Sequence, residues 1–238
     1  MIDTLVNCNH KEIKGRCSGW KFKGGSYTKY DDHGTHVATT IAARNTGTGG
    51  MVGVAPKAYI HSYGFLDTGA GTNRNETAAI NHARKKGVRA INMSYGPWTK
   101  STGGPYPNGT VFVSTGSNTI NNIRATRNKN IVFVKAGGND GAVMRNVFLT
   151  FNAYTELKNL IIVGAVKSNR RIASFSNRPG AGCFYNFKCN KKNKFMYFTV
   201  TAPGQGIYAG KGNGGYRSMN GTSMAAPHVT GVVALLHG

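Results

Sequence analysis

The sequence predicts an α/β protein in which helices cover both faces of a mostly parallel β-sheet. The first observation is that short apolar runs, rich in β-branched and aromatic residues, alternate with stretches of helical character. The second is that glycines follow several of these runs, at the strand ends where such sheets bind ligands. The 238 residues, 39% of them hydrophobic, suffice for one domain, and neither a repeat nor a linker divides positions 1–238.

Each expected element follows from its local pattern. Apolar and β-branched residues predict strands at 58–65, 89–96, 110–116, 130–138 and 160–166. Helical character is found at 31–43, at 76–87, where Gly87 ends the helix, and at 223–236, where small apolar residues dominate. Glycine, proline and polar residues at 99–108 and 178–194 indicate two surface loops.

Charge is the most unusual property of the composition. The chain has 30 Lys and Arg against 8 Asp and Glu, a net charge of +22. Such a field attracts nucleic acids, acidic cell surfaces and anionic substrates. No nucleic-acid-binding motif accompanies the charge, so the basic run at 188–194 is interpreted as a solvated surface and no specific nucleic-acid partner is expected. With so few carboxylates, each one raises the question of what it does.

The sequence shows neither a membrane span nor a signal peptide. No run of about 18 apolar residues occurs, so no membrane span is expected. The first 30 residues are polar and do not resemble a signal peptide. Two interpretations stay open, a cytosolic protein or a piece of a longer exported precursor.

Four cysteines form two local pairs, Cys8 with Cys17 and Cys183 with Cys189. Neither pair has CxxC spacing and no histidine accompanies the second pair, so zinc binding is not expected. Two short-loop disulfides, each stabilising by about 2–3 kcal/mol, would indicate an oxidising compartment. Four free thiols are the alternative.

Three glycine-bearing stretches carry candidate chemistry. His33 precedes a helical run, Asn139 follows two glycines after a strand, and Ser223 follows Gly-Thr at the start of a helix. Each has an ordinary explanation by itself, as a helix cap or a turn residue. Their occurrence together and in this order is far more specific.

Four motifs follow one another along the chain: HGTHVA (33–38), INMSYG (91–96), AGGN (136–139) and GTSMAAPHVTG (221–231). Together they resemble the subtilisin-like serine proteases, peptidase family S8. Three further fragments agree with this family: GVAPKA (53–58), ASFSN (173–177) and TAPG (201–204). The resemblance extends from Ile2 to about Leu236 and implies a three-layer subtilisin-like fold. Its closest match in character is the group of bacterial exported proteases, including autotransporter proteases.

The resemblance implies a catalytic triad of Asp3, His33 and Ser223, with Asn139 as an oxyanion donor. His33 would take the proton of Ser223, and Asp3 would hold the imidazole in the required tautomer and stabilise its charged form. The backbone N–H of Ser223 at a helix N-terminus and the amide of Asn139 would stabilise the oxyanion. The expected reaction is hydrolysis of peptide bonds by a serine endopeptidase through an acyl-enzyme.

The resemblance also implies how a polypeptide would bind. The segment Ser94-Tyr95-Gly96 would pair with an extended peptide as an added strand. Ala136-Gly137-Gly138 would form one wall of the primary specificity pocket. The side chain of Tyr95 is either a packing aromatic or the lining of a subsite. A monomer is expected, secreted or at the cell surface in its full-length form, and a longer precursor has room for a propeptide or a translocator domain.

Four features depart from the family pattern. Leu5 and Thr39 stand where glycine is usual, which would be costly if the backbone needed φ above zero or the packing were tight. Lys135 lies in the strand before the oxyanion turn and must reach solvent or a partner. The chain is also expected to be incomplete at both ends, because two residues precede Asp3 and the family's closing segments do not follow Gly238.

Several neighbours of the motif residues receive structural roles. His36 matches a histidine that is structural in the family, and His228 is assigned to a helix interior. Pro227 is expected in the first turn of its helix, where proline is tolerated. Asp31 and Asp32, just before His33, are interpreted as helix caps, with a local acidic field as the alternative.

Calcium is common in the family, and the loop at 43–53 resembles a calcium-binding region. This loop contains no carboxylate, so neither tight calcium binding nor another cofactor is expected. Two rival hypotheses accompany the protease. One is a truncated or degenerate homologue with little or no activity, motivated by the departures above, and the other is a nucleic-acid-binding protein, motivated by charge alone.

Overall fold

The computed structural model describes residues 1–23, 25, 31–47, 49–68, 73–96, 98–100, 110–113, 118–127, 129–144, 157–180 and 194–238. Seven strands form one parallel sheet in the order β10-β9-β7-β4-β1-β3-β2. Their bounds are β1 Ile2–Asp3, β2 Cys17–Trp20, β3 Ile60–Gly64, β4 Ala90–Met93, β7 Val132–Ala136, β9 Leu160–Val166 and β10 Thr199–Pro203. β9 has the predicted bounds, because a strand buried on both faces reads as a continuous apolar run.

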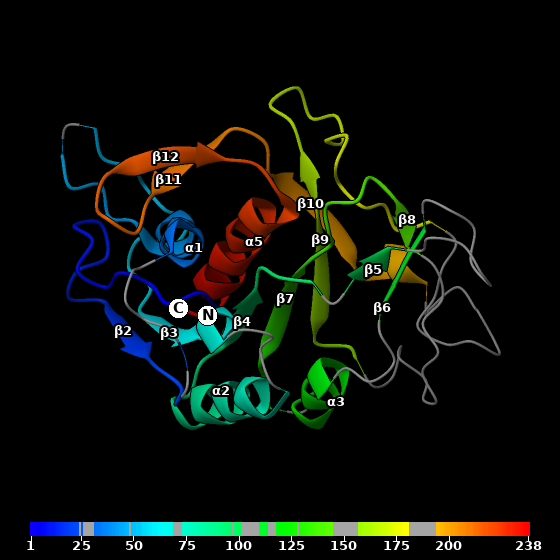
Figure 1. Ribbon diagram of the computed structural model, residues 1–238, viewed down its shortest axis with the longest axis horizontal. Coiled ribbons are helices and arrows are strands. Elements are labelled where there is room, and N and C mark those ends of the chain that lie inside the picture. The colour runs from blue at the N-terminus through cyan, green and yellow to red at the C-terminus, as the bar shows by residue number, and fades with distance from the viewer. Residues whose placement is uncertain are drawn as a thin grey trace.

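Helices cover both faces of this sheet (Figure 1). One face carries α1 (Asp32–Ala42) and α5 (Thr222–Leu236), and the other carries α2 (Asn73–Lys85) and α3 (Asn118–Ala125). Alternation along β7 serves both layers, since Phe133 packs with Ile80 of α2 and Ile123 of α3, whereas Val134 packs with Ala225 of α5. The three layers confirm the predicted fold class.

β1 is the shortest strand of the sheet but lies in its interior. Ile2 pairs with Tyr63 of β3 on one side and with Met93 of β4 on the other. Its side chain is fully buried. Two residues therefore suffice to fix Asp3, because both edges of the strand are occupied.

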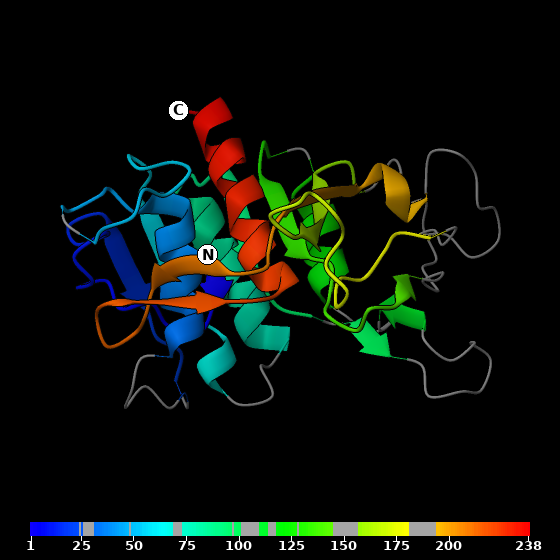
Figure 2. The same cartoon turned by 90° about the horizontal axis from the view of Figure 1, so that it is seen from above.

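Two smaller sheets flank the main one. β11 (Ile207–Gly210) and β12 (Tyr216–Met219) form an antiparallel hairpin beside α1, as Figure 2 shows from above. β6 (Thr110–Val113) pairs with β5 (Trp98–Lys100) and β8 (Val143–Met144). The predicted run at 110–116 thus forms a strand outside the main sheet, because β4 pairs directly with β7 and leaves no place between them. Two short 3₁₀ helices, η1 (Leu66–Thr68) and η2 (Phe195–Tyr197), complete the elements of the described segments.

A disulfide joins Cys8 and Cys17, as one of the two predicted pairs. Cys183 and Cys189 lie outside the described residues, as do most of the two predicted surface loops. Within the described segments, no helix has both the length and the apolar character needed to cross a bilayer.

Candidate active site

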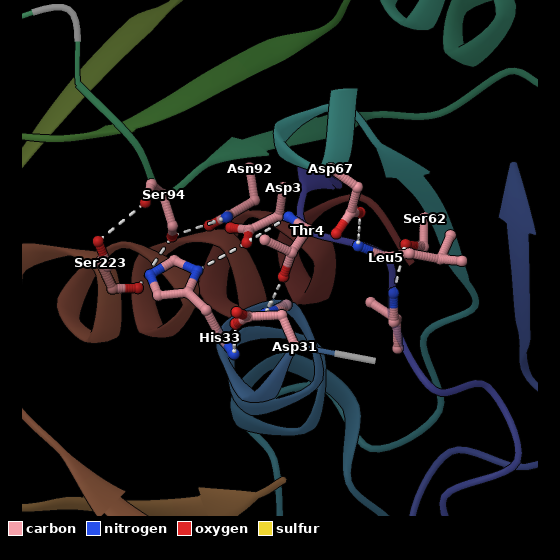
Figure 3. A network of polar contacts seen from close by, with 12 residues as sticks. Asp3, Thr4, Leu5, Asp31, His33, Ser62, Asp67, Asn92, Ser94 and Ser223 are labelled. Carbon is pink, nitrogen blue, oxygen red and sulfur yellow. Dashed lines mark hydrogen bonds and ion pairs between the residues drawn. The ribbon is translucent and has the colours of Figure 1, made fainter. Parts of the chain in front are cut away.

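Three predicted functional side chains meet at the carboxyl edge of the sheet (Figure 3). Asp3 ends β1, His33 lies in the first turn of α1, and Ser223 lies in the first turn of α5. In Figure 3 the imidazole of His33 lies between Asp3 and Ser223. The structure thus brings together residues that are 30 and 190 positions apart in the sequence.

Asp3 holds one nitrogen of His33. Nδ1 of His33 is 2.6 Å from Oδ1 of Asp3, which also accepts a hydrogen bond from the backbone N–H of Thr4 at 2.7 Å. Burial disfavours the charged imidazole, but the charge and hydrogen bond of Asp3, together with the charge of Asp31, outweigh it and raise the pKa of His33. Because Nδ1–H donates to Asp3, neutral His33 presents its Nε2 lone pair as a proton acceptor.

The backbone after Asp3 is held by side chains of three other elements or loops. The N–H groups of Leu5, Val6 and Asn7 donate to Asp67 at 2.6 Å, Ser62 at 3.2 Å and Thr35 at 3.0 Å, respectively. The hydroxyl of Thr4 in turn accepts the N–H of Gly34 at 2.9 Å. This chain of bonds fixes the position of α1 relative to β1, and therefore that of His33 relative to Asp3.

Ser223 is held by the segment that follows β4. Its hydroxyl donates to the backbone carbonyl of Ser94 at 2.8 Å, and the hydroxyl of Ser94 donates to the carbonyl of Ser223 at 2.9 Å. Among the described residues, Ser94 and not His33 is the hydrogen-bond partner of the Ser223 hydroxyl. Catalytic hydrogen bonds often form only when substrate binds, so this arrangement is compatible with a resting site.

The carbonyl of Ser223 is free for Ser94 because of Pro227. Proline has no N–H, so the carbonyl four residues earlier loses its helical partner. The sequence placed Pro227 in the first turn of the helix, but α5 begins at Thr222 and contains Pro227 in its interior. The prediction was wrong in this respect, and the hydroxyl of Ser94 supplies the donor that the helix lacks.

Two residues that the sequence did not single out support Ser94. Nδ2 of Asn92 donates to the hydroxyl of Ser94 at 2.9 Å, and Oδ1 of Asn92 accepts the hydroxyl of Thr230 at 2.9 Å. Asn92 and Thr230 are both buried. A polar residue within the apolar run at 89–96 was the available signal, because a buried amide needs partners.

Asn139 and the start of α5 form a pair of converging donors. Oδ1 of Asn139 accepts the N–H of Thr222 at 2.8 Å and its hydroxyl at 2.9 Å, which directs the amide N–H₂ away from the helix. A Cβ added to Gly221 would lie 3.3 Å from Nδ2 of Asn139 and 3.6 Å from the backbone nitrogen of Ser223. Glycine at this position carries no side chain, so both nitrogens lie within 4 Å of one point that no Cβ occupies.

Asn177 holds the backbone on both sides of Asn139. Its Nδ2 donates to the carbonyl of Gly137 at 2.9 Å, and its Oδ1 accepts the N–H groups of Asp140 and Ala142, both at 3.1 Å. The N–H of Gly138 donates to the hydroxyl of Thr222 at 3.0 Å. Ala136 and Gly137 are buried, and Gly138 is half-buried beside the start of α5.

Comparison with known proteins identifies the family. A profile of the subtilase family (peptidase S8) matches residues 1–238. The chain belongs to the subtilase family. It is 34% identical over 238 residues to Subtilisin DY of Bacillus licheniformis, covering 99% of this chain and 74% of that protein. It is 32% identical over 240 residues to thermitase of Thermoactinomyces vulgaris, covering 99% and 73%. It spans 51% of the thermophilic serine proteinase of Bacillus sp. (strain AK1), at 34% identity over 240 residues and 99% of this chain.

Solved structures agree with this assignment. The patellamide maturation protease PatA has a TM-score of 0.70 at 26% identity, covering 99% of this chain and 75% of that chain. A cold adapted subtilisin-like serine proteinase has a TM-score of 0.65 at 25% identity, covering 99% and 72%. The predicted family and the class of serine endopeptidase are thereby confirmed. The closeness to autotransporter proteases stays a prediction.

The two glycine replacements of this subtilase are each matched by a glycine on a neighbouring strand. Leu5 does not have a positive φ, and its buried side chain packs against Gly19 of β2, where a Cβ would lie 3.2 Å from Leu5 Cδ1. The methyl of Thr39 faces Gly210 of β11, where a Cβ would lie 2.9 Å from Thr39 Cγ2. The hydroxyl of Thr39 accepts the N–H of Gly210 at 2.9 Å. Neither replacement therefore forces the helix or strand apart.

The segment of Ser94, Tyr95 and Gly96 leaves the sheet after β4. Ser94 is buried, Tyr95 is half-buried and Gly96 is exposed. The Tyr95 ring packs with Phe65 at 5.3 Å between centroids, and its hydroxyl donates to Glu76 at 2.7 Å. The Tyr95 side chain thus packs against the core, which agrees with the first of its two predicted roles, a packing aromatic.

Carboxylates gather around His33. Asp31 caps α1 by accepting the N–H of His33 at 2.6 Å, as predicted. Asp32, predicted as a second cap, is inside α1 and instead accepts the N–H of Gly212 at 2.9 Å and pairs with Arg217 at 2.7 Å. With Asp67 and His33 they line part of a cavity of about 590 Å³. Asp67 is partly desolvated there, and its burial, reinforced by the charges of Asp31 and Asp3, raises its pKa.

The loop at 43–53, expected to lack a carboxylate, receives one from Glu12. This fully buried carboxylate accepts the hydroxyl of Thr46 at 3.0 Å, the N–H of Thr46 at 3.2 Å, the N–H of Met51 at 3.4 Å and the hydroxyl of Tyr216. Every one of these partners is a hydrogen-bond donor, whereas calcium requires several oxygen ligands with free lone pairs. No group of three or more His, Cys, Asp or Glu side chains suited to a metal occurs in the described part of the chain. The residues around Glu12 do not fit a calcium ion.

Proposed function

We propose that this subtilase is a serine endopeptidase that cleaves extended polypeptides through an acyl-enzyme. Asp3 is the triad acid, His33 the general base and Ser223 the nucleophile. The observation that carries the proposal is the 2.6 Å contact between Asp3 and Nδ1 of His33, on an imidazole that lies beside the N-terminal turn of α5. This contact supplies the tautomer that a triad needs.

In the proposed reaction, His33 Nε2 removes the proton of Ser223 as its Oγ attacks the peptide carbonyl. The oxyanion then forms between Nδ2 of Asn139 and the backbone N–H of Ser223, aided by the N-terminal end of α5. His33 gives the proton to the leaving amine, which departs and leaves the acyl group on Ser223. Water, deprotonated by His33, then attacks this acyl-enzyme, and Ser223 regains its proton as the carboxylic acid product is released. The Ser223 hydroxyl must first exchange its bond to the Ser94 carbonyl for one to His33.

The substrate is proposed to lie along Ser94, Tyr95 and Gly96 as an added strand, with Ala136, Gly137 and Gly138 as the wall of the primary pocket. Support comes from the end of β4 at Met93, after which the next residues are no longer paired with β7. Gly96 is exposed there and lets a peptide backbone approach.

A fluorophosphonate probe tests this function directly. The folded protein is expected to form a covalent adduct at Ser223, located by mass spectrometry of peptides, and to hydrolyse a fluorogenic peptide. The Ser223→Ala variant is expected to lose both. Absence of an adduct in cooperatively folded wild-type protein would show that the site is inactive.

The competing candidate is a subtilase of low activity. The observation that favours it is the bond of the Ser223 hydroxyl to Ser94 in place of His33. If it holds, the protein melts cooperatively yet neither labels nor turns over a peptide. Measurable turnover together with a cooperative melt excludes it.

We also propose that the protein acts outside the reducing cytosol as a monomer, without a metal cofactor and without a specific nucleic-acid partner. The Cys8–Cys17 disulfide supports an oxidising compartment. Sedimentation of the purified protein, and its thiol content before and after reduction, test the monomer and the disulfide. A propeptide or translocator segment belongs to the same proposal and is tested by the size of the precursor in cells that express the gene.

A further inference from the structure

A lysine is buried beside the proposed substrate-binding segment. Lys135 is only 3% exposed, which is unusual for one of the 30 basic residues of the chain, since lysine normally lies on the protein surface. Its Nζ donates to the backbone carbonyl of Tyr95 at 2.7 Å and lies 4.7 Å from the centroid of the Tyr95 ring. Buried ammonium groups are rare and costly unless paired, so this contact calls for a function.

The carbonyl of Tyr95 lies just beyond the point where the pairing of β4 with β7 ends, so a side chain supplies its donor. β4 and β7 pair as far as Met93 and Lys135. Beyond this point Gly137 continues the pairing with β9, through its N–H to the carbonyl of Val163 at 2.9 Å. The pairing of β4 with β7 has ended, and the side chain of Lys135 makes the bond from β7 to the 94–96 segment.

Charged and polar groups on both neighbouring elements stabilise the ammonium in this position. Glu76 of α2, itself 2% exposed, accepts the hydroxyl of Tyr95 at 2.7 Å and attracts Lys135. The ring of Tyr95 presents its electron-rich face to Nζ. Burial lowers the pKa of Lys135 to about 8 against the opposing charge of Glu76, so the group is still largely protonated at neutral pH.

The backbone of the 94–96 segment is held at two successive carbonyls. The carbonyl of Ser94 points to Ser223, whose hydroxyl it accepts at 2.8 Å, and the carbonyl of Tyr95 points to Lys135. Tyr95 stands at a bend of the backbone, so these two contacts fix the bend that precedes the exposed Gly96.

We propose that Lys135 is a positioning residue that ties the proposed pocket wall at 136–138 to the 94–96 segment and holds this segment in register for an extended substrate. Its backbone belongs to the strand that continues into Ala136 and Gly138, and its ammonium binds the carbonyl of Tyr95. The inference rests on the proposed function, because it assigns a role in binding the substrate of the same site.

The test compares substrates that use the segment with substrates that do not. Lys135→Met keeps the length and volume of the side chain and removes the donor, and Lys158→Met removes an exposed lysine as a matched control. For an extended peptide amide, Lys135→Met is expected to raise KM about tenfold, the loss typical of one charged hydrogen bond. For a single-residue ester, which does not reach residues 94–96, KM is expected to change less than about twofold.

Loss of folded protein would lower the rates on both substrates equally and leave KM unchanged, so such a result contradicts the positioning role. If Lys135→Met does not melt cooperatively, Lys135→Gln and Lys135→Arg replace it. Only arginine retains a long charged donor, so it is expected to keep the extended-substrate KM closer to that of the wild type. Equal KM values for the two variants overturn the inference.

Peptide binding without cleavage separates this inference from the proposed function. Fluorescence polarisation measures the Kd of a labelled extended peptide for Ser223→Ala and for Ser223→Ala with Lys135→Met. A Kd that rises about tenfold with the second substitution supports the role of Lys135 even if the wild type shows no turnover. No binding to Ser223→Ala, or the same Kd for both proteins, overturns it.

Discussion

At the scale of single residues, Asp3 shows how a two-residue strand can hold a side chain against a histidine of another element. Its strand lies between β3 and β4, and the residues that follow it donate their N–H groups to side chains of other segments. One oxygen of Asp3 binds His33 and Thr4, whereas Oδ2 is buried and has no hydrogen-bond partner among the residues that the structure describes. The orientation of the carboxylate therefore depends on Oδ1 alone.

Replacement of Asp3 by asparagine tests this arrangement. The amide has the size of the carboxylate but cannot stabilise an imidazolium, so kcat/KM for a peptide is expected to fall about 10⁴-fold. The unfolding free energy is expected to change by less than about 2 kcal/mol, because the substitution removes a buried charge with an unpaired oxygen. Steady-state kinetics and urea unfolding measure the two effects. A loss of activity below tenfold would show that Asp3 is not the triad acid.

The pH dependence of activity depends on Asp31 as well. Activity requires neutral His33, so it falls as the pH drops through the pKa of His33, which Asp3 and Asp31 raise. Asp31→Asn keeps a good helix cap and removes one of these charges, so the acidic limb of the kcat/KM profile is expected to move to lower pH.

Asp140→Asn is the matched control for that profile. It removes an exposed carboxylate that does not contribute to the pKa of His33, and its acidic limb is expected to stay in place. A limb that stays fixed in Asp31→Asn, or moves to higher pH, contradicts the assignment of the limb to His33.

The sequence singled out Asp3, His33, Ser223 and Asn139 because each lies in a short motif of the family, and their catalytic roles stay proposals. It did not predict Asn92, Thr230 or the role of Ser94, because their bonds join α5 to β4 across more than 120 positions. For Lys135 the sequence left two alternatives open, reaching solvent or finding a partner. The structure shows the second, and the partner is a backbone carbonyl, which carries no signature in the sequence.

At the scale of elements, α5 contains Pro227, which cannot donate a hydrogen bond to the carbonyl of Ser223. The hydroxyl of Ser94, just after β4, donates to this carbonyl in its place. The carbonyl of Ser223 accepts Ser94 because Pro227 offers no N–H. Alanine at 227 would restore the helical donor. The two donors thus compete for one carbonyl, which a double-mutant cycle can measure.

Ser94→Ala leaves this carbonyl without its donor and is expected to cost about 1–3 kcal/mol of unfolding free energy. In that background, Pro227→Ala is expected to recover about 1 kcal/mol more than it gives in the wild type, because the new N–H replaces the lost hydroxyl. Urea denaturation of the four proteins gives the coupling energy. A coupling near zero would mean that Ser94 and Pro227 act independently.

The strands and helices that the sequence predicted are mainly the buried ones. The five predicted strands and three predicted helices are present, since each carries a continuous apolar run or a buried face. β2 and β10, at the two edges of the sheet, were not predicted, because Cys17–Trp20 and Thr199–Pro203 are half-exposed and rich in glycine, serine or threonine. The placement of β6 in a separate sheet depends on the pairing of β4 with β7, which no local pattern reveals.

At the scale of the whole molecule, the few acidic residues of this basic protein have specific hydrogen-bond partners. The chain has 8 carboxylates against 30 basic residues, and Glu156 lies outside the described segments. Each of the others accepts a hydrogen bond from a named partner, at Asp3, Glu12, Asp31, Asp32, Asp67, Glu76 and Asp140. The acids that remain in this basic protein therefore have specific structural or catalytic positions.

Glu12 gives a prediction for the stability of the entire fold. Burial would raise the pKa of Glu12, but its hydrogen bonds to Tyr216, Thr46 and Met51 outweigh this and lower it. The carboxylate therefore stabilises the fold above its ordinary pKa of 4.5, and this contribution is lost as the pH falls below that value. Glu12→Gln is expected to reduce the unfolding free energy by about 1–3 kcal/mol at neutral pH, measured in urea.

Calcium chelation is the companion measurement. Because hydrogen-bond donors surround Glu12, addition of EDTA or of millimolar calcium is expected to leave the melting temperature of the wild type unchanged within about 1 °C. A large rise with calcium that disappears in Glu12→Gln would show that the loop at 43–53 exchanges these donors for the ion.

The order of strands in the sheet has a consequence for how activity arises in time. Asp3 comes first in the sequence, but its strand pairs with β3 and β4, and Ser223 comes in the helix that packs on β4, β7, β9 and β10. Contacts of such long sequence separation close large loops and form slowly. The proposed nucleophile can meet its proposed base only after nearly the whole chain has been ordered. Partly folded chains are thus expected to be proteolytically silent, and the appearance of activity during refolding should lag behind the appearance of secondary structure.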